Sequence, residues 1–364
     1  MKNETIFEFV RFSIDDSIKE FSHPGDLDWE MLDSFSMKHC ITGMLYAGLE
    51  KLSKNHDLPI DIIANWYVQA DIIKQLNERF NEAVVAVTRQ FEKDGFPNCV
   101  LKGQGNAMMY PVPGLRSPGD IDLWLLGERE RIFKYVRKDF PDTEMLYHHL
   151  EYPIFEDVMV EVHFFPMFLN NPVYNWRFQK WVKAVAKEQC NNRVTLPQGS
   201  FCRPTTDFNI IYQLAHIRHH FFDEGIGLRQ IMDYYFLIKD EKVLAQKDRI
   251  CELLTTFGLT GFAKAVMYVL KVVFNLEERF FLVRPDAKIG QMLLDEIMMT
   301  GNFGKNDSRY GDLKRRSRVY RLSALLKKNL RFWWYFPGEV VFSFLFRLWQ
   351  PVWRCWANMT YSKS

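Results

Sequence analysis

The chain has 364 residues, of which 48% are hydrophobic and 25% are charged, so it is long enough for two or three packed units. Lys and Arg number 47 against 45 Asp and Glu, which gives a formal net charge of +2. The net charge is therefore too small to suggest that the molecule as a whole attracts nucleic acid, and the sequence shows no clear nucleic-acid patch.

The six cysteines are scattered, without a CxxC pair or another zinc-type spacing. In a chain of this size they indicate reduced thiols in a cytoplasmic protein. The start of the chain, MKNETIFEFVRF, lacks the sustained apolar core and the small-residue cleavage site of a signal peptide. No run of about 18 apolar residues is uninterrupted, so a membrane-spanning helix is not expected.

Helical periodicity dominates the first part of the chain. It is present in residues 28–50 and 57–94, where apolar side chains recur every four residues from Ile72 to Val84. Gly95 then supplies a stop signal. The sequence therefore predicts an N-terminal helical region over residues 1–95.

Between residues 96 and 170, short apolar runs alternate with a helix. NCVLKG and GDIDLWLL each have the length of a strand, and GERERIFKYVRKDF indicates a helix that ends at Pro141. TEMLYHHLEYPIFEDVMVEVHFF indicates two more strands with a turn between them. This order of elements describes a small α/β or α+β domain.

The rest of the chain is predicted to form a helical domain over residues 171–330 and an aromatic tail over residues 331–364. Thr205, Thr206 and Asp207 can each cap a helix. Five of the ten Trp lie in the tail, whose apolar run is interrupted by prolines and charged residues. The tail either docks on the body of the protein or makes a peripheral membrane or protein contact, since Trp and Arg suit an interface.

Two aspartates, separated by one residue, lie at the start of an otherwise apolar strand. Asp120 immediately precedes the sequence IDLWLL, and Asp122 is its second residue. Side chains alternate between the faces of a strand, so Asp120 and Asp122 project together on the face opposite Leu123. Like charges this close repel each other unless a cation lies between them, and Mg²⁺ prefers carboxylate oxygens. The alternative is a half-exposed edge strand with two solvated aspartates.

A third carboxylate lies in VMVEVHF. Val160 and Val162 share one face of this strand, and Glu161 and His163 share the other. If this strand neighbours the aspartate strand in one sheet, Glu161 faces the same side as the aspartates. Such a trio predicts a two-metal site, in which Glu161 ligates the metal on the nucleophile side. The alternative is a surface-facing polar pair.

Upstream, the sequence Lys102-Gly103-Gln104-Gly105 ends the first strand and opens a short helical turn. A small residue at such a turn lets backbone N–H groups approach a phosphate. Lys102 and Arg116 are cations suited to a triphosphate. The turn is not a Walker motif, which needs GxxxxGK[ST].

Together these motifs resemble the polymerase-β-like nucleotidyltransferases, which have a Gly-centred turn, a strand bearing Asp-x-Asp and a later strand bearing a third carboxylate. More narrowly, LKGQG, RSPGDIDLWL, VMVEVHF and HIRHHFFDEGIGLRQIMD are similar, in this order, to a bacterial family of uncharacterised nucleotidyltransferases. The resemblance covers about residues 96–240. It implies an α+β fold, with a small mixed β-sheet core flanked by N-terminal helices and by a C-terminal helical domain that caps the cleft.

The resemblance also implies roles for individual residues. Asp120, Asp122 and Glu161 are expected to be the catalytic metal ligands, with Mg²⁺ or Mn²⁺ as the cofactor. The expected nucleotide-binding residues are Lys102, Gly103, Gln104, Arg116 and Arg229. The chain departs from the superfamily in three respects: Lys-Gly replaces the usual Gly-Ser, the third carboxylate is Glu instead of Asp, and the loop at 110–119 is longer.

Six of the nine histidines lie in clusters at 148–149, at 163 and at 216–220. His216 and His220 share a helix face, a spacing that can bind a transition metal, although the glutamate of HExxH is missing. The alternative is that these histidines are satisfied in the core or on a helix surface. The resemblance implies instead that the helical domain presents His216, His220, Arg229 and Asp233 to the cleft, together with His163. Arg229 could pair with Asp233 or reach the phosphates.

These features predict a metal-dependent nucleotidyltransferase that transfers an NMP from an NTP to an unidentified hydroxyl acceptor and releases pyrophosphate. One alternative is a catalytically inactive nucleotide-binding or scaffold protein of the same fold. Another is a histidine-metal hydrolase built on His148, His163, His216 and His220. No motif identifies the acceptor or the preferred base.

Overall fold

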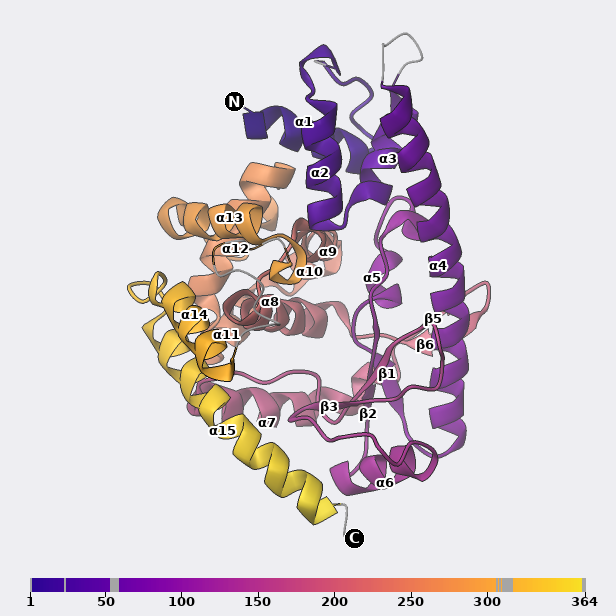
Figure 1. The fold of residues 1–364 in the computed structure, drawn as a ribbon, viewed down its shortest axis with the longest axis vertical. Coiled ribbons are helices and arrows are strands. Elements are labelled where there is room, and N and C mark those ends of the chain that lie inside the picture. Colours follow the sequence, from indigo (N-terminus) through magenta and orange to yellow (C-terminus); the bar gives the residue numbers. More distant parts are fainter. Residues whose placement is uncertain are drawn as a thin grey trace.

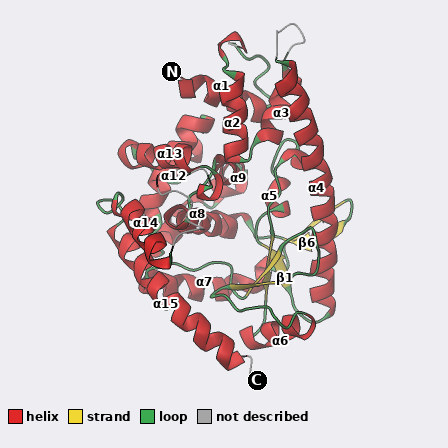
Figure 2. Cartoon of the chain, in the orientation of Figure 1, coloured by secondary structure: helices red, strands yellow, loops and turns green. Residues whose placement is uncertain are grey.

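Helices dominate the structure, and the strands gather in one small region (Figure 1, Figure 2). The computed structural model describes residues 2–22, 24–52, 59–305, 307, 309 and 317–361. Within these residues the strands form a four-stranded mixed sheet and a separate two-stranded sheet. The predicted α+β class, with a small mixed sheet flanked by helices, is therefore confirmed.

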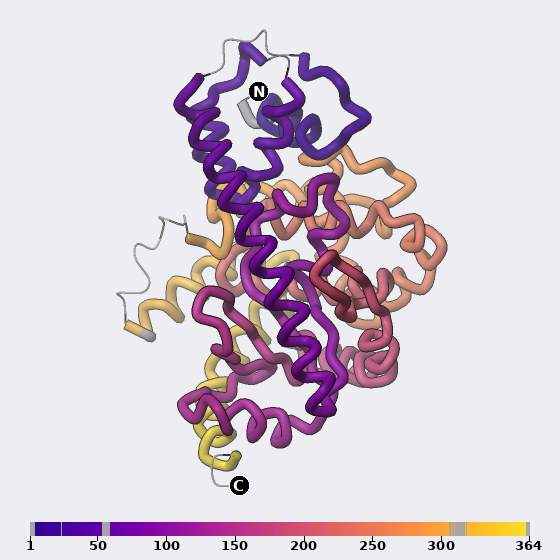
Figure 3. The backbone as a smooth tube through the Cα atoms, turned by 90° about the vertical axis from the view of Figure 1, so that its right-hand side faces the viewer, coloured from indigo at the N-terminus to yellow at the C-terminus, as the bar shows by residue number. Residues whose placement is uncertain are grey.

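The N-terminal part contains the helices α1 (Lys2–Ile14), α2 (Trp29–His39), α3 (Thr42–Lys51) and α4 (Ile60–Lys93). The last three agree with the predicted helical periodicity, and α1 lies within the predicted helical region 1–95 but outside the segments whose periodicity indicated it. α2 begins where the Asp28 side chain accepts a hydrogen bond from the backbone N–H of Met31. The long α4 runs from the N-terminal helices down to the sheet, as Figure 3 shows.

The four-stranded sheet contains β1 (Asn98–Val100), β2 (Ile121–Leu125), β3 (His149–Glu151) and β4 (Val160–His163), in the order β1-β2-β4-β3. The central strands β2 and β4 are parallel, and each outer strand is antiparallel to its neighbour. α5 (Gln104–Ala107) follows β1, and α6 (Arg129–Asp139) follows β2. The predicted adjacency of the two carboxylate-bearing strands is confirmed, because Asp122 pairs with Glu161 in the register.

Side-chain alternation sends the two faces of the sheet into different apolar cores. Leu123 and Val162 lie in a core shared with α4 and α6. On the opposite face, Trp124 stacks on Phe208 of α8 (Thr206–Asp223), with ring centroids 5.8 Å apart. The helical half of the chain therefore covers the polar face of the sheet.

From residue 172 the chain is mostly helical, as the sequence predicts. The helices besides α8 are α7 (Pro172–Gln189), α9 (Leu228–Ile238), α10 (Glu241–Ala245), α11 (Lys247–Thr256), α12 (Thr260–Phe274), α13 (Ala287–Thr300), α14 (Arg318–Leu330) and α15 (Pro337–Tyr361). The N-terminal helices share one apolar core with them. Arg11 of α1, for example, donates a hydrogen bond from Nε to the carbonyl oxygen of Val273 in α12 at 3.0 Å.

A β-hairpin interrupts the predicted helical region. It consists of β5 (Arg193–Leu196) and β6 (Gly199–Cys202), which are antiparallel. Phe201 is fully buried in the core that α4 shares with the sheet. At Gly199 a Cβ atom would lie 2.6 Å from a methyl carbon of Val85, so the hairpin turn needs glycine to approach α4 this closely. The hairpin thus packs against α4 in the same core as the four-stranded sheet, while forming a separate sheet.

The aromatic tail forms α15, a single helix that continues through Pro351. Glu339, which interrupts the apolar run in the sequence, is buried and accepts a hydrogen bond from the Asn170 amide. Its second carboxylate oxygen lies 3.6 Å from Arg218 of α8. The tail therefore docks on the body of the protein through this face, while the predicted membrane or protein contact stays a prediction. None of the helices in the described residues combines the length and the apolarity needed to span a bilayer.

Candidate active site

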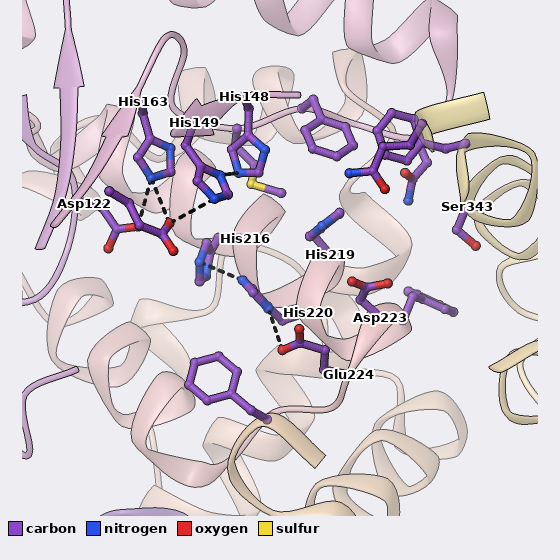
Figure 4. Close-up of a pocket in the computed structure, with 18 of the residues that line it drawn as sticks. Asp122, His148, His149, His163, His216, His219, His220, Asp223, Glu224 and Ser343 are labelled. Carbon is purple, nitrogen blue, oxygen red and sulfur yellow. Dashed lines mark hydrogen bonds and ion pairs between the residues drawn. The ribbon is translucent and has the colours of Figure 1, made fainter. Parts of the chain in front are cut away.

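The polar face of the sheet, α8 and α15 surround a cavity of about 270 Å³ (Figure 4). The sheet carboxylates line it together with Lys102 and with all six of the clustered histidines. These residues are Asp120, Asp122, Glu161, His148, His149, His163, His216, His219 and His220. Motifs that are far apart in the sequence therefore converge on one pocket.

Asp122 and Glu161 lie side by side because β2 and β4 pair in parallel register. Asp122 is only 2% exposed, and Asp120 immediately precedes β2. Burial alone would raise the pKa of Asp122, but the charge of Lys102 and the hydrogen bond from His163 outweigh it and lower that pKa. The pKa of Glu161 is likewise lowered, against burial, mainly by His163. Both carboxylates are therefore ionised near neutral pH.

The Lys102 ammonium lies among the carboxylates. Its Nζ is 3.1 Å from Asp122 Oδ2, 3.6 Å from Asp120 Oδ1 and 3.3 Å from His216 Nε2. Burial would lower the pKa of Lys102, but the neighbouring carboxylates raise it above its usual value. Lys102 is therefore the counter-ion that holds the carboxylates together, and its contact with a triphosphate stays a prediction.

His163 lies between the two strand carboxylates. Its Nε2 is 3.0 Å from Asp122 Oδ1 and 3.5 Å from Glu161 Oε2. Burial would lower the pKa of His163, but its hydrogen bonds to the two carboxylates raise it to about 9. Without a bound ion, His163 is therefore protonated near neutral pH, and its Nε2–H donates to the carboxylates, a bond that stays available if the Nδ1 proton is replaced.

The other histidines come from the start of β3 and from α8. Burial lowers the pKa of His148, His149, His216 and His219, that of His149 to about 4. His216 and His220 are one turn apart on α8, and their Nε2 atoms are 3.1 Å apart. His216 and His220 thus lie in the pocket, where the family resemblance placed them.

The Lys-Gly turn brings Lys102 to the aspartate strand. Gly103 has a positive φ of 62°, and a Cβ atom there would lie 3.2 Å from the carbonyl oxygen of Asp120. Gln104 is buried, and its amide donates a hydrogen bond to Asn81 Oδ1 of α4 at 2.5 Å. Gln104 therefore fixes the turn against α4 and does not line the pocket in the described structure.

Replacing Gly103 by Ala is expected to destabilise the protein by about 1–3 kcal/mol, because an alanine at this φ is strained and its Cβ crowds Asp120. Urea unfolding of the two proteins measures the difference. Gly338→Ala is the control, since a Cβ at Gly338 meets no atom within 4 Å. Equal unfolding midpoints for the two variants would show that Gly103 is not constrained.

The structure gives Arg116 a different partner from the predicted triphosphate. Its Nε and Nη2 donate to the two carboxylate oxygens of Asp233, both at 2.7 Å, and the Tyr110 hydroxyl donates to Asp233 at 2.6 Å. Arg116 and Asp233 are 4% and 5% exposed, and neither lines the pocket. The pair instead joins the 110–119 loop to α9.

Arg229 also holds this loop. Its Nη1 donates to the carbonyl oxygens of Ser117 at 2.8 Å and Pro118 at 3.2 Å. Of the two roles predicted for Arg229, the structure shows neither a pair with Asp233 nor a position in the pocket wall. Arg229 thus positions the backbone that leads into Asp120.

Several pocket residues are not predicted by the sequence. Asp223 and Glu224 end α8, and Glu224 Oε2 lies 3.6 Å from His220 Nδ1. Phe346 and Arg347 reach the pocket from α15, where Arg347 forms an ion pair with Asp223. The repeated histidines could have indicated the α8 residues, whereas nothing in the tail sequence indicates a pocket wall.

The donor atoms of the pocket fit divalent ions. The side chains of Asp122, Glu161 and His163 each place one ligand atom within 4.8 Å of the others, and Asp120 adds carboxylate oxygens beside them. Oxygen donors of this kind suit Mg²⁺ and Mn²⁺. Asp122, Glu161 and His163 on the central strands β2 and β4 can therefore hold a divalent ion.

A mixed sheet that presents an aspartate pair and a third carboxylate to a pocket is the arrangement expected of a nucleotidyltransferase. The profile of a protein family described as "Uncharacterised nucleotidyltransferase" matches residues 25–275, and the chain belongs to this family. It is also similar to a solved structure described as an antigenic nucleotidyltransferase-like protein from Paracoccidioides brasiliensis. That similarity has a TM-score of 0.34 and 12% identity, over 61% of this chain and 98% of the other. No curated protein matches the chain.

Proposed function

We propose that this protein transfers an NMP from an NTP to a hydroxyl acceptor in a metal-dependent reaction. The observation that carries the proposal is the pairing of Asp122 with Glu161 on adjacent parallel strands, beside Asp120, in a member of a nucleotidyltransferase family. The acceptor oxygen forms a bond to the α-phosphorus, and the bond from this phosphorus to the bridging oxygen breaks. Pyrophosphate leaves, and the hydroxyl proton passes to solvent.

Asp120, Asp122 and Glu161 are the residues that would hold Mg²⁺ or Mn²⁺. When bound, such ions neutralise phosphate charge and promote ionisation of the attacking hydroxyl. The chain itself fixes Asp122 and Glu161 on two hydrogen-bonded strands, so the separation of these two carboxylates does not depend on a mobile loop. His163 bonds to both strand carboxylates and thereby orients them.

Among the Lys and Arg side chains that the structure describes, Lys102 forms the ion pairs with Asp120 and Asp122. We infer that it contacts the phosphates of the bound NTP, because it lines the pocket and its Nζ lies 3.1 Å from Asp122. We assign the phosphate contact to Lys102 and not to Arg116 or Arg229, because Arg116 pairs with Asp233 of α9 and Arg229 donates to the carbonyl oxygen of Ser117 in the 110–119 loop. Their contribution is to hold the loop that precedes β2.

The proposal also places the chain in the polymerase-β-like superfamily, as a bacterial and cytoplasmic enzyme. The Asp-x-Asp strand beside a strand with a third carboxylate supports the superfamily. The sequence motifs shared with the bacterial family support the origin. All six cysteines are free, which supports a reducing compartment.

The experiment is a transfer assay with purified protein, Mg²⁺ or Mn²⁺, and each of the four α-labelled NTPs. Lysate fractions containing protein, RNA or small metabolites serve as acceptors. We expect one fraction to gain label from at least one NTP, with matching release of pyrophosphate. If calorimetry detects NTP binding but no fraction is labelled, the proposal is overturned in favour of an inactive nucleotide-binding protein.

A further inference from the structure

Three histidines gather on one wall of the pocket. His149 of β3 pairs with His163 of β4 in the register, and His148 immediately precedes β3. Their ring centroids are 4.4, 5.2 and 5.3 Å apart, and Figure 4 shows the rings side by side. One nitrogen from each lies within 4.8 Å of the other two.

The spacing of the nitrogens suits a metal ion. His148 Nε2 and His149 Nδ1 are 3.2 Å apart. Two nitrogens bound to one tetrahedral zinc ion, each at about 2.0–2.1 Å, are roughly 3.3 Å from each other. His163 Nδ1 is buried and has no hydrogen-bond partner within the described residues. Glu161 Oε2 lies 3.7 Å from His149 Nε2 and can orient that ring.

We propose that His148, His149 and His163 bind a divalent transition-metal ion of the Zn²⁺ class. Such ions bind imidazole nitrogens well, whereas Mg²⁺ takes oxygen ligands almost exclusively. The ion is distinct from the one that the three carboxylates hold in the proposed function, although both lie in one pocket. Its binding requires no nucleotide and no transfer activity.

The test measures metal binding directly on the full chain. Chelator-treated protein is titrated with Zn²⁺ against a chromophoric competitor, and with Co²⁺, whose visible absorption reports imidazole ligation. We expect one equivalent of Zn²⁺ per chain in the wild type, and at least a tenfold weaker affinity in His149→Gln. His148→Gln gives a second, independent variant, and circular dichroism checks that each variant is folded.

His219→Gln is the matched control, because His219 lines the same pocket but lies outside the group of three. We expect it to bind Zn²⁺ as the wild type does. The proposal is overturned if the wild type retains no Zn²⁺, or if His149→Gln and His148→Gln bind it as tightly as His219→Gln. A protein that binds Zn²⁺ but transfers no nucleotide would contradict the proposed function alone.

A second observation, on the outer surface, is independent of the pocket. The face of α15 that points away from the body carries a continuous row of exposed apolar side chains, which we call the α15 stripe. The stripe consists of Val341, Leu345, Leu348, Trp349, Val352, Trp356 and Met359, each 39–69% exposed. Their spacing of three, four and seven residues places them on one face of the helix.

The part of the sequence that carries the α15 stripe has a net positive charge. Residues 312–364 contain 11 Lys and Arg against one Asp and one Glu, which leaves 36 basic and 43 acidic residues in the rest of the chain. Arg321 and Lys327 of the neighbouring α14 are exposed. The segment that carries the α15 stripe thus has an excess of basic over acidic residues, although Arg331, Arg347 and Arg354 pair with Glu296, Asp223 and Glu144.

We propose that the α15 stripe lies on the surface of an anionic lipid bilayer. Trp and aliphatic side chains enter the boundary between headgroups and acyl chains, and basic residues near the surface attract anionic headgroups. The opposite face of the same helix stays on the body, where Val340, Ser343 and Ala357 are buried. The stripe can therefore contact a bilayer while α15 keeps its packing against the body of the protein.

The test is co-sedimentation of the full chain with vesicles of phosphatidylcholine alone or mixed with phosphatidylserine. We expect binding to the mixed vesicles that weakens with added salt, and at least a tenfold loss of binding in Val352→Glu/Trp356→Glu. Both side chains are more than half exposed, so the substitutions disturb little packing. Trp176→Glu is the control, because Trp176 is 65% exposed but belongs to α7.

Failure of the wild type to bind mixed vesicles overturns the lipid assignment. So does equal binding by the stripe variant and by Trp176→Glu. If sedimentation without vesicles shows a dimer that Val352→Glu/Trp356→Glu dissociates, and vesicles bind neither protein, the stripe is covered by a second copy and not by lipid.

Discussion

Asp122→Asn is expected to lower the rate of nucleotide transfer about a thousandfold. Asp122 is the most buried of the three carboxylates and lies opposite Glu161, so it contacts any ion held between β2 and β4. An amide keeps the shape of the side chain but removes the negative charge that attracts the ion. The measurement is the initial rate of pyrophosphate release at saturating NTP and metal.

The same substitution changes the local charge balance, so stability must be measured beside activity. Lys102 keeps Asp120 as a partner at 3.6 Å, and we therefore expect Asp122→Asn to remain folded. Glu151→Gln is the matched control, because Glu151 pairs with Glu161 in the same sheet but is exposed and outside the pocket. Transfer by Asp122→Asn at the rate of Glu151→Gln would show that the carboxylate pair is not the metal site.

The carboxylate site is the part of the structure that short-range sequence patterns predict well. Alternation within β2 places Asp122 opposite the buried Leu123, and alternation within β4 places Glu161 opposite Val162. Each pattern needs only the period of a strand. The prediction needed one long-range assumption, that the two strands are neighbours. The register that pairs Asp122 with Glu161 confirms this assumption.

The roles of charged residues in loops and helices are harder to predict, because they depend on partners far away in the sequence. Arg116 has the chemistry of a phosphate ligand, but its partner Asp233 lies 117 residues later, on α9. The tail likewise carries no local sign that Phe346 would line a pocket. Sequence patterns identify a side chain's chemistry, whereas its partner is decided by the packing of whole elements.

Glycines show the same division. Gly103 is identified by its place between a strand and a short helix, a local signal. Gly199 is constrained by Val85 of α4, more than a hundred residues earlier, so the sequence predicts helix where the hairpin β5–β6 forms. The short strands of the hairpin also give too few residues for a clear period.

Arg116→Ala is expected to destabilise the protein by about 3–5 kcal/mol, because it leaves the buried carboxylate of Asp233 without its ion-pair partner. Burial would raise the pKa of Asp233, but Arg116 outweighs it and lowers that pKa, so the carboxylate is ionised in the folded protein. The free energy of unfolding in urea, at neutral pH, measures the loss.

The control for this prediction is an ion pair of equal geometry on the surface. Arg79 donates from Nε and Nη2 to Asp157 at 2.8 and 3.0 Å, but both side chains are well exposed. We expect Arg79→Ala to shift the unfolding midpoint little, because water replaces the lost partner. The double variant Arg116→Met/Asp233→Leu separates charge from packing, since it removes both buried charges together. We expect the double variant to be more stable than Arg116→Ala. A double variant that is less stable would show that the packing of the two side chains, and not their charge, holds the loop.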